Sequence, residues 1–211
     1  MIDGIRTTTA TTLVLFLSCG LLALGGCDDS DPTLPPPGET IAENFAFEDG
    51  MEGWYAVATD TLSPPIEWHV EHTAEPSHTG AGAVELFLAN YNDAGKIWME
   101  RPFDLEAGTT YEVEVDYAFG TTDWGDVNLF TIIAGVHSSP PREAEDLSFQ
   151  GDTGHGQSQD AGLVWLDKSY SFTATASGAG TLYVALGVWG TWETPRTYFV
   201  DDVTVRFTPV G

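Results

Sequence analysis

The chain has 211 residues, of which 42% are hydrophobic, and its formal net charge at pH 7 is -25. This length suits one domain, and the hydrophobic fraction is sufficient for a buried core, which excludes a wholly disordered chain. Because only 7 Lys and Arg stand against 32 Asp and Glu, the chain lacks the basic surface that binds nucleic acid. The acidity therefore excludes nucleic acid and other polyanions as partners. It favours high solubility or carboxylate binding of calcium.

The N-terminus has the features of a targeting segment. Leu13–Ala23 is an apolar run as long as a signal-peptide core and shorter than the roughly 20 residues of a membrane-spanning helix. It leads into Leu24-Gly25-Gly26-Cys27, which resembles a bacterial lipobox. The resemblance implies cleavage before Cys27 and attachment of diacylglycerol to its thiol. The alternative is a buried N-terminal helix with an incidental cysteine.

Lipidation would place the chain in the bacterial cell envelope, anchored in a membrane and facing the periplasm or the cell exterior. Two acyl chains give stable anchoring. Cys19 would be removed with the signal, which leaves Cys27 as the one mature cysteine and excludes a disulfide within the mature chain.

Asp28–Thr40 is rich in proline and aspartate and has few apolar residues. Such a composition is typical of an extended, semi-rigid spacer. We therefore expect three parts: a signal peptide at 1–26, the lipidated cysteine and an acidic tether at 27–43, and one folded module at 44–211.

The folded module shows the period of two that is typical of β-strands. Tyr111–Tyr117 alternates apolar and acidic residues without interruption. The same criterion predicts further strands at Ala83–Leu88, Ile97–Phe103, Val127–Val136, Ser169–Thr175, Leu182–Val188 and Thr197–Phe207. Turn signals separate these strands, at Glu106–Gly108, Gly120–Gly125, Ser177–Gly180 and Gly190–Pro195. The pattern predicts an all-β fold, a jelly-roll β-sandwich of two antiparallel sheets. The polar stretch Ser138–Gly162 is predicted to be a mobile surface loop.

Four motifs occur in order along this module: Phe47–Trp54 (FEDGMEGW), Ser77–Gly80 (SHTG), Phe103–Tyr111 (FDLEAGTTY) and Tyr198–Val203 (YFVDDV). Together they resemble carbohydrate-binding modules of the family 4 and 9 type. The resemblance implies a galactose-binding-like jelly roll that binds a glycan and performs no catalysis.

The resemblance also implies a structural calcium ion. Carried over by position, the backbone carbonyls of Ala46 and Gly80 and the carboxylate of Asp201 would be its ligands. Mixed carbonyl and carboxylate oxygens suit this hard cation. The alternative is that Asp201 merely ends a strand at the solvent edge.

Members of the family bind glycan across a concave sheet through aromatic rings and amides. At the matching positions this sequence has Val57, Arg101, Phe130, His137 and Ala185 instead, which departs from the family pattern.

A different set of residues predicts a stacking platform. On Leu182–Trp189 the face opposite the core would present Tyr183 and Trp189, with small Ala185 and Gly187 between them. Arg101 and His137 would supply hydrogen bonds beside these rings, and Trp124 and Trp192, in glycine-containing turns, would add exposed aromatic surface. In the alternative arrangement Trp189 closes the end of the core and Tyr183 packs under the long loop.

The sequence does not support a zinc site or a glycosidase active site. His69, His72 and His78 lie close in sequence, but the first two would point to opposite faces of a strand and no cysteine completes a zinc site. Glu112, Glu114 and Asp116 on one strand face resemble the acid cluster of laminarinase-type glycosidases, without that family's motif order. We therefore expect a non-catalytic module with a glycan as ligand. The alternatives are a structural or adhesive protein that contacts other proteins and, less favoured, a small glycoside hydrolase.

Overall fold

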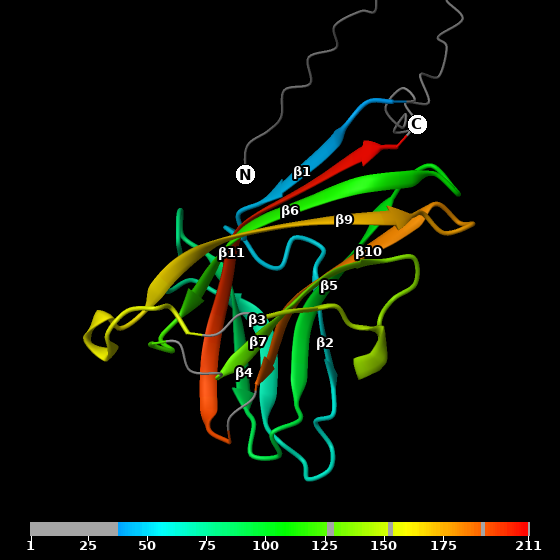
Figure 1. Cartoon of the computed structure of the whole chain (residues 1–211). Helices are drawn as coiled ribbons and strands as arrows, with labels where there is room; N and C mark the ends of the chain where they lie inside the picture. Colours follow the sequence, from blue (N-terminus) through cyan, green and yellow to red (C-terminus); the bar gives the residue numbers. More distant parts are fainter. Residues whose placement is uncertain (1–37, 126–128, 152–153, 191–192, 211) are drawn as a thin grey trace, which may run out of the picture. The chain divides into compact units, whose positions relative to one another are not determined.

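The computed structural model describes residues 38–125, 129–151, 154–190 and 193–210 (Figure 1). By its internal contacts the chain divides into a unit of residues 1–33 and a second unit of residues 34–211, and every described residue belongs to the second. Cys27 and Trp192, which were assigned to lipidation and to ligand binding, lie outside the described residues.

Nearly all regular structure in the described residues is β-strand. In chain order the strands are β1 (Ile41–Phe45), β2 (Tyr55–Thr59), β3 (Trp68–Thr73), β4 (Ala83–Ala89), β5 (Lys96–Asp104), β6 (Thr110–Thr121), β7 (Phe130–His137), β8 (Phe149–Gln150), β9 (Val164–Thr175), β10 (Thr181–Gly190) and β11 (Pro195–Pro209). Two single-turn 3₁₀ helices, η1 (Ala144–Asp146) and η2 (Gln159–Ala161), interrupt the segment between β7 and β9. No helix in these parts of the chain has the length and apolar character to cross a membrane.

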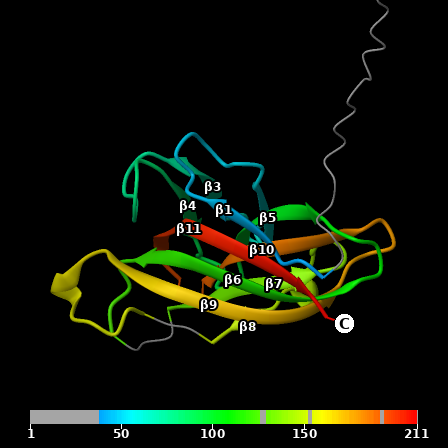
Figure 2. The ribbon, with the colours of Figure 1, turned by 90° about the horizontal axis from the view of Figure 1, so that it is seen from above.

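The strands form two antiparallel sheets. Sheet I is six-stranded, in the order β3-β4-β11-β6-β9, and β1 pairs with β11 in addition. Sheet II is five-stranded, in the order β2-β5-β10-β7-β8. The long β11 serves both ends of sheet I: its first half pairs with β4, and its second half pairs with β1. Figure 2 shows β1, β11, β6 and β9 side by side at one end of this sheet.

The core lies between the two sheets, where the alternation in the sequence places apolar side chains. In β6, for example, Tyr111, Val113 and Val115 are buried, whereas Glu112 and Glu114 are exposed. Large side chains with no more than 1% exposure fill the centre: Phe47, Phe119, Phe130, Tyr198 and Phe207. Burial of such a side chain contributes about 1.5–3 kcal/mol. The predicted jelly-roll β-sandwich of two antiparallel sheets is therefore confirmed.

The strands predicted from alternation all exist, with bounds that differ by a few residues. Three short N-terminal strands, β1, β2 and β3, and the two-residue β8 were not among them. β1 forms because Ile41 and Phe45 lie opposite Phe207 and Val203 on the distant β11. The predicted start of the folded module at residue 44 falls inside this strand, so β-structure begins three residues earlier.

Part of the predicted mobile surface loop at Ser138–Gly162 packs on the sandwich. Residues 138–150 turn back over sheet II and end in β8, which pairs with β7 at Ile132 and Ile133. Leu147 is only 8% exposed and packs against the sheet. A single buried leucine within a polar stretch gives no periodic signal, which is why the sequence pattern did not reveal this packing.

Candidate functional site on the outer face of sheet II

The face of sheet II that points away from the core carries most of the predicted ligand-binding residues. At one end of this face Trp189 of β10 lies opposite Lys96 of β5 and Thr131 of β7. At the other end Tyr183 lies opposite Pro102 and His137. These two rows are six residues apart, which at about 3.3 Å per residue is about 20 Å. We call them the Trp189 end and the His137 end.

The chain itself covers the middle of this face. Leu147 packs on Trp98, Ile133 and Ala185, which are all fully buried. Ala134 holds the covering segment from below, because its N–H donates to Ser148 O (3.2 Å) and its carbonyl accepts from Gln150 Nε2 (3.0 Å). We call residues 138–150 the cover.

The cover overturns the prediction of an open platform between Tyr183 and Trp189. Ala185 and Gly187, which were expected to lie bare between the two rings, are buried. Gly187 also has no room for a side chain, since a Cβ there would lie 2.1 Å from Ile97 O. Gly187 therefore permits close approach of the β5 backbone, and Ala185 lies beneath Leu147 of the cover, so neither residue offers a flat surface to a ligand.

A buried ion pair fastens the cover to the sheet. The Glu100 side chain is 0% exposed, and it accepts hydrogen bonds from Arg142 of the cover at 3.0–3.2 Å. Tyr55 Oη donates to the same carboxylate, and Trp98 Nε1 donates to it at 3.3 Å. Burial, and then the hydrogen bond to Glu100, raise the pKa of Tyr55, so its hydroxyl remains protonated and available as a donor.

Two aromatic rings meet at the Trp189 end. Phe149 lies with its ring centroid 5.6 Å from that of Trp189, at an interplanar angle of 61°. Phe149 is 37% exposed, whereas Trp189 is half-buried. Lys96 Nζ lies 4.9 Å from the Trp189 ring centroid and forms an ion pair with Asp60 at 2.7 Å. The sequence pattern missed Phe149 because β8 is too short to show alternation.

At the His137 end the predicted neighbours are together, and both are half-buried. Tyr183 and His137 lie directly opposite each other on β10 and β7 and so share one face. Burial lowers the pKa of His137, although Glu100 and Asp146 partly oppose this effect. The imidazole is therefore neutral at pH 7.

The structure places Arg101 away from this face, which corrects the prediction. Arg101 lies opposite the core residue Val184. Its guanidinium stacks over Phe45 and Phe103, at 4.4 and 4.8 Å from the ring centroids, and pairs with Glu43. Adjacent residues of a strand point to opposite faces, so it is Glu100 that faces outward.

Two other residues of the sequence prediction lie elsewhere. Phe130, which stands at another position where this sequence departs from the family pattern, is fully buried in the core. Trp124 is 45% exposed, as predicted. It follows β6, a strand of sheet I, whereas the candidate site lies on sheet II.

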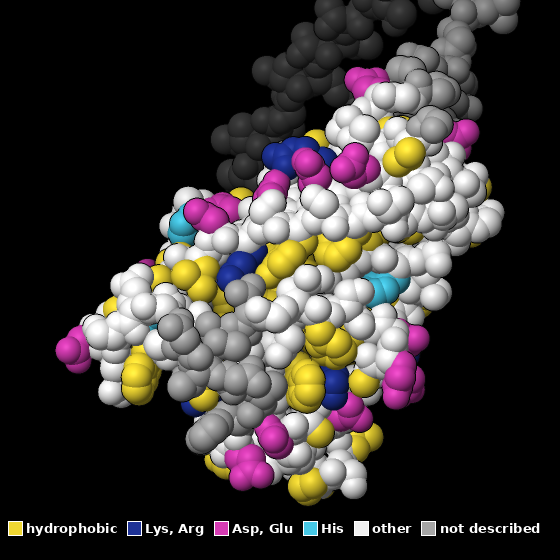
Figure 3. Space-filling view, viewed as in Figure 1, with side chains coloured by type: hydrophobic (Ala, Val, Ile, Leu, Met, Phe, Trp, Pro, Cys, Tyr) yellow, Lys and Arg dark blue, Asp and Glu magenta, His cyan; other side chains and the backbone are white. Residues whose placement is uncertain are grey.

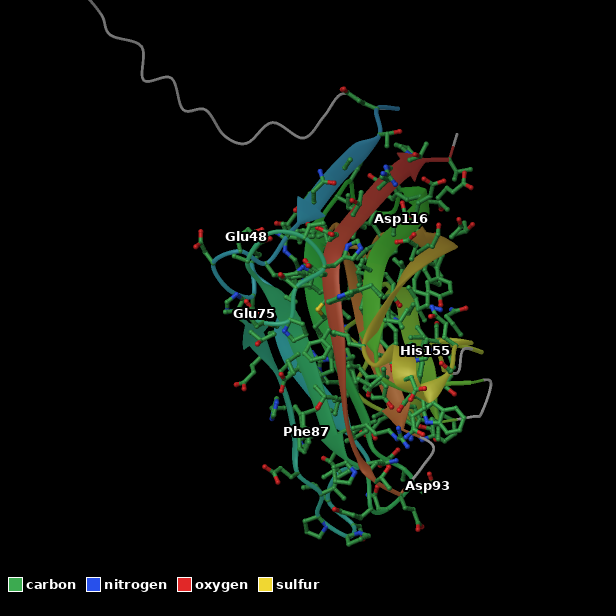
Figure 4. All side chains as sticks on the ribbon, turned by 90° about the vertical axis from the view of Figure 1, so that its left-hand side faces the viewer. Glu48, Glu75, Phe87, Asp93, Asp116 and His155 are labelled. Atoms are coloured by element: carbon green, nitrogen blue, oxygen red, sulfur yellow. The ribbon has the colours of Figure 1, made fainter. Side chains whose placement is uncertain are left out.

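The three segments of the predicted calcium site converge. Asp201 Oδ2 accepts the N–H groups of His78 (2.8 Å) and Thr79 (3.2 Å), which brings β11 to the turn before β4. Glu48, two residues after Ala46, accepts the N–H of Ala81 at 2.8 Å. Figure 4 shows Glu48 and Glu75 of that turn on the same side of the molecule, with Asp93 farther down.

The donors at this convergence are oxygen atoms, which suits calcium. Among the described residues no three His, Cys, Asp or Glu side chains are grouped as a metal site, so backbone carbonyls would have to complete the coordination. Sequence reasoning missed Glu48, although it stands in the opening motif. Asp201 is 0% exposed, and burial raises its pKa despite three backbone N–H donors. A buried carboxylate of this kind gains from a nearby cation.

The acidic row that suggested catalysis stays on the outer face of β6, and among the described residues the histidines that suggested zinc are not grouped with other metal ligands. Arg206 pairs with Asp116 and lies 3.9 Å from Glu114 on the outer face of sheet I (Figure 4). A hydrogen bond from Ser169, together with Arg206, lowers the pKa of Asp116, which disfavours a role as general acid. His69 pairs with Glu85, and His78 pairs with Asp202.

No protein-family model matches the sequence, and no curated protein matches it. Among solved structures, the chain is similar to the K1 cleaved adhesin domain of Lys-gingipain from Porphyromonas gingivalis W83, with 15% identity over 82% of this chain and 100% of that one, at a TM-score of 0.51. The K3 adhesin domain of the same protein is 16% identical over 77% and 97%, also at 0.51. A family 61 carbohydrate-binding module in complex with β-1,4-galactotriose is 16% identical over 76% and 92%, at 0.46. The similarity to the two adhesin domains supports the fold, a jelly-roll β-sandwich.

The buried ion pair yields a stability prediction. Arg142→Ala should lower the free energy of unfolding by about 2–3 kcal/mol, because it leaves Glu100 buried without its cation. This value allows for the 48% exposure of the Arg142 side chain, which weakens the pair. Arg206→Ala, which removes an exposed pair on sheet I, should cost less than about 1 kcal/mol. Urea denaturation measures both, and equal losses would contradict the role given to Glu100.

Proposed function

We propose that the chain is a lipid-anchored, non-catalytic module of the bacterial cell envelope that binds a neutral glycan. Three features support this: the lipobox after the apolar N-terminal run, the ordered motifs of the carbohydrate-binding-module type, and a jelly roll with aromatic side chains on one sheet face.

The observation that carries the proposal is the Phe149–Trp189 pair. A sugar ring stacks on an exposed aromatic face that lies beside polar groups, because its C–H face is apolar and its hydroxyls need partners. Phe149 offers exposed ring surface, Trp189 supports it edge-on, and Lys96 and Thr131 flank Trp189. The pair therefore has the composition of a weak stacking site.

Glycoside hydrolysis is less well supported. It needs two carboxyl groups about 5–9.5 Å apart on either side of the bond to be cleaved, one of them held protonated. The acidic row of sheet I is solvated, and its Asp116 has a lowered pKa. Glu100 on the other face is engaged with Arg142 beneath the cover. Neither arrangement supplies an acid and a base to one cleft.

The stacking proposal predicts the effect of Phe149→Ala. This change should weaken retention by a neutral polysaccharide about five- to tenfold, since an aromatic contact is worth about 1 kcal/mol or more. It should also lower the free energy of unfolding by about 1 kcal/mol, because the ring loses its edge-on contact with Trp189. Tyr91→Ala, which removes a ring that is 61% exposed in the β4–β5 turn, is the control. Affinity electrophoresis in gels containing xylan or β-1,4-galactan measures retention. No retention of the unmutated chain by any neutral glycan would favour an adhesive module instead.

The anchor is tested separately. Cys27→Ser removes the acceptor thiol, so the protein should leave the membrane fraction or keep its signal peptide. Fractionation and mass spectrometry of the N-terminus distinguish these products. A Cys27→Ser variant that remains in the membrane as an acylated chain of mature length would disprove the assignment.

We also propose that calcium binds where Glu48, Asp201 and the turn before β4 meet. Ionised Asp201 opposes folding at pH values above its raised folded-state pKa, and this cost disappears below its unfolded pKa. A bound divalent cation would offset that cost and tie three chain segments together, with Ala46 and Gly80 supplying carbonyl oxygens.

Calcium should therefore raise the melting temperature relative to chelator. At a hundredfold excess over the dissociation constant the gain is about 2.7 kcal/mol. Glu48→Gln, which keeps an acceptor for Ala81, and Asp201→Asn should both remove the response. The response should also fade as pH falls, because the ligands must be deprotonated. Identical melting curves of the unmutated chain in calcium and in chelator would refute the site.

A further inference from the structure

A second polar site lies at the His137 end, outside the stacking pair. A cavity of about 370 Å³ opens between the end of β7 and the end of β9. Its volume falls within the range of about 300–1,000 Å³ that small-molecule sites occupy. Its polar lining consists of His137, Ser138, Ser139, Asp146, Thr173 and Thr175. In Figure 3 the apolar side chains of this side gather in a band across the middle of the molecule, with acidic side chains above and below.

Asp146 is held in a fixed orientation at the cavity. Its Oδ2 accepts the N–H groups of Arg142 (3.0 Å) and Glu143 (3.1 Å), which closes the turn of η1. These backbone hydrogen bonds lower the pKa of Asp146, so it is ionised at pH 7. Since both bonds go to one oxygen, Oδ1 retains accepting capacity for a ligand hydroxyl. The ion pair between Arg142 and Glu100 anchors this turn to the sheet.

The opposite wall belongs to the open edge of sheet I. Among the described strands β9 pairs only with β6, so alternate N–H and C=O groups along β9 point away from the sheet. Near the end of the strand, Thr173, Ala174 and Thr175 line the cavity, and this part of the edge contributes backbone groups that point away from β6. Together with the hydroxyls and the neutral imidazole of His137, they offer both donors and acceptors.

The charge of the cavity restricts its ligand. Its lining contains one carboxylate and no Lys or Arg, within a chain of net charge -25. Phosphates and acidic sugars would meet repulsion without a compensating cation. A neutral polyhydroxylated molecule satisfies the donors and acceptors without that cost.

We propose that this cavity binds one neutral sugar unit, as a subsite about 20 Å from the Phe149–Trp189 pair. The inference takes its ligand class from the proposed glycan-binding function. Asp146 and the Thr173 hydroxyl hydrogen-bond the sugar hydroxyls, and the small side chains of Val136 and Ala174 contact its C–H groups.

An extended peptide added to the β9 edge is the competing occupant, and the edge is poorly suited to it. Lys168 lies near the middle of β9 on the side of Leu166 and Tyr170, which pack against the core. A charge that faces inward on an edge strand opposes the addition of another strand. The cavity also involves only the last three residues of β9.

Matched variants of the purified full-length chain test the proposal. Thr173→Val removes a hydroxyl at constant shape, and Asp146→Asn removes the charge while an amide oxygen still accepts the N–H groups of η1. Each should weaken retention by xylan or β-1,4-galactan at least fivefold without a change in melting temperature. Ser171→Ala, on the same exposed side of β9 but outside the cavity, should have no effect.

The outcomes separate this inference from the proposed function. Retention that is lost in Phe149→Ala but unchanged in Thr173→Val and Asp146→Asn overturns the subsite and leaves glycan binding intact. Absence of retention by every neutral polysaccharide overturns glycan binding itself. A threonine-rich decapeptide that shifts backbone amide NMR signals along the whole of β9, while galactotriose shifts none, would assign the edge to peptide and refute the sugar subsite. Shifts by galactotriose confined to 136–139 and 173–175 support it.

Discussion

Glu100 projects from the centre of the outer face of sheet II, where a carboxylate buried without a partner would cost several kcal/mol. Arg142 supplies a cationic partner because residues 138–150 fold back across the sheet, so this ion pair ties the cover to the sheet. Leu147 then fills the space above Trp98 and Ala185. The covered centre separates the two ends of this face, the Trp189 end and the His137 end. Both candidate sites are consequences of this pairing: β8 carries Phe149 to one, and η1 carries Asp146 to the other.

The sequence predicts a strand well where one face of that strand is buried and the other is exposed to solvent. β6 is the clearest case, because its Glu residues alternate with Tyr111, Val113 and Val115. The same reasoning fails for β1, which depends on pairing with a segment about 160 residues away. It also fails for the cover, because the Arg142–Glu100 ion pair and the single buried leucine that hold it produce no repeating hydrophobic pattern in the sequence. Local pattern therefore recovers the sandwich but not the element that shapes its outer face.

The alternation of side chains between the two faces of a strand explains why only some of the predicted site residues lie together. His137, Tyr183 and Trp189 share the outer face because paired residues on adjacent strands point the same way. Arg101 was placed with them by analogy with the family, and a shift of one residue sends it to the other side of β5. Phe149 and Glu48 escaped notice for a different reason: one lies in a two-residue strand and the other in a turn motif that was interpreted as a landmark rather than as a ligand.

The excess of acid gives the two ends a common selectivity. A chain with 32 acidic and 7 basic residues repels anionic polymers at long range, and repulsion of a wrong partner is as effective for specificity as attraction of the right one. Much of this charge lies where it does not touch a neutral ligand, as on the outer face of sheet I, where Glu112 and Glu114 point into solvent. The ends of sheet II instead present rings, hydroxyls and backbone groups, whose interactions do not depend on the net charge of the chain. Under the proposed function, this charge would disfavour acidic glycans, while shape and hydrogen bonding at the two ends would select among neutral ones.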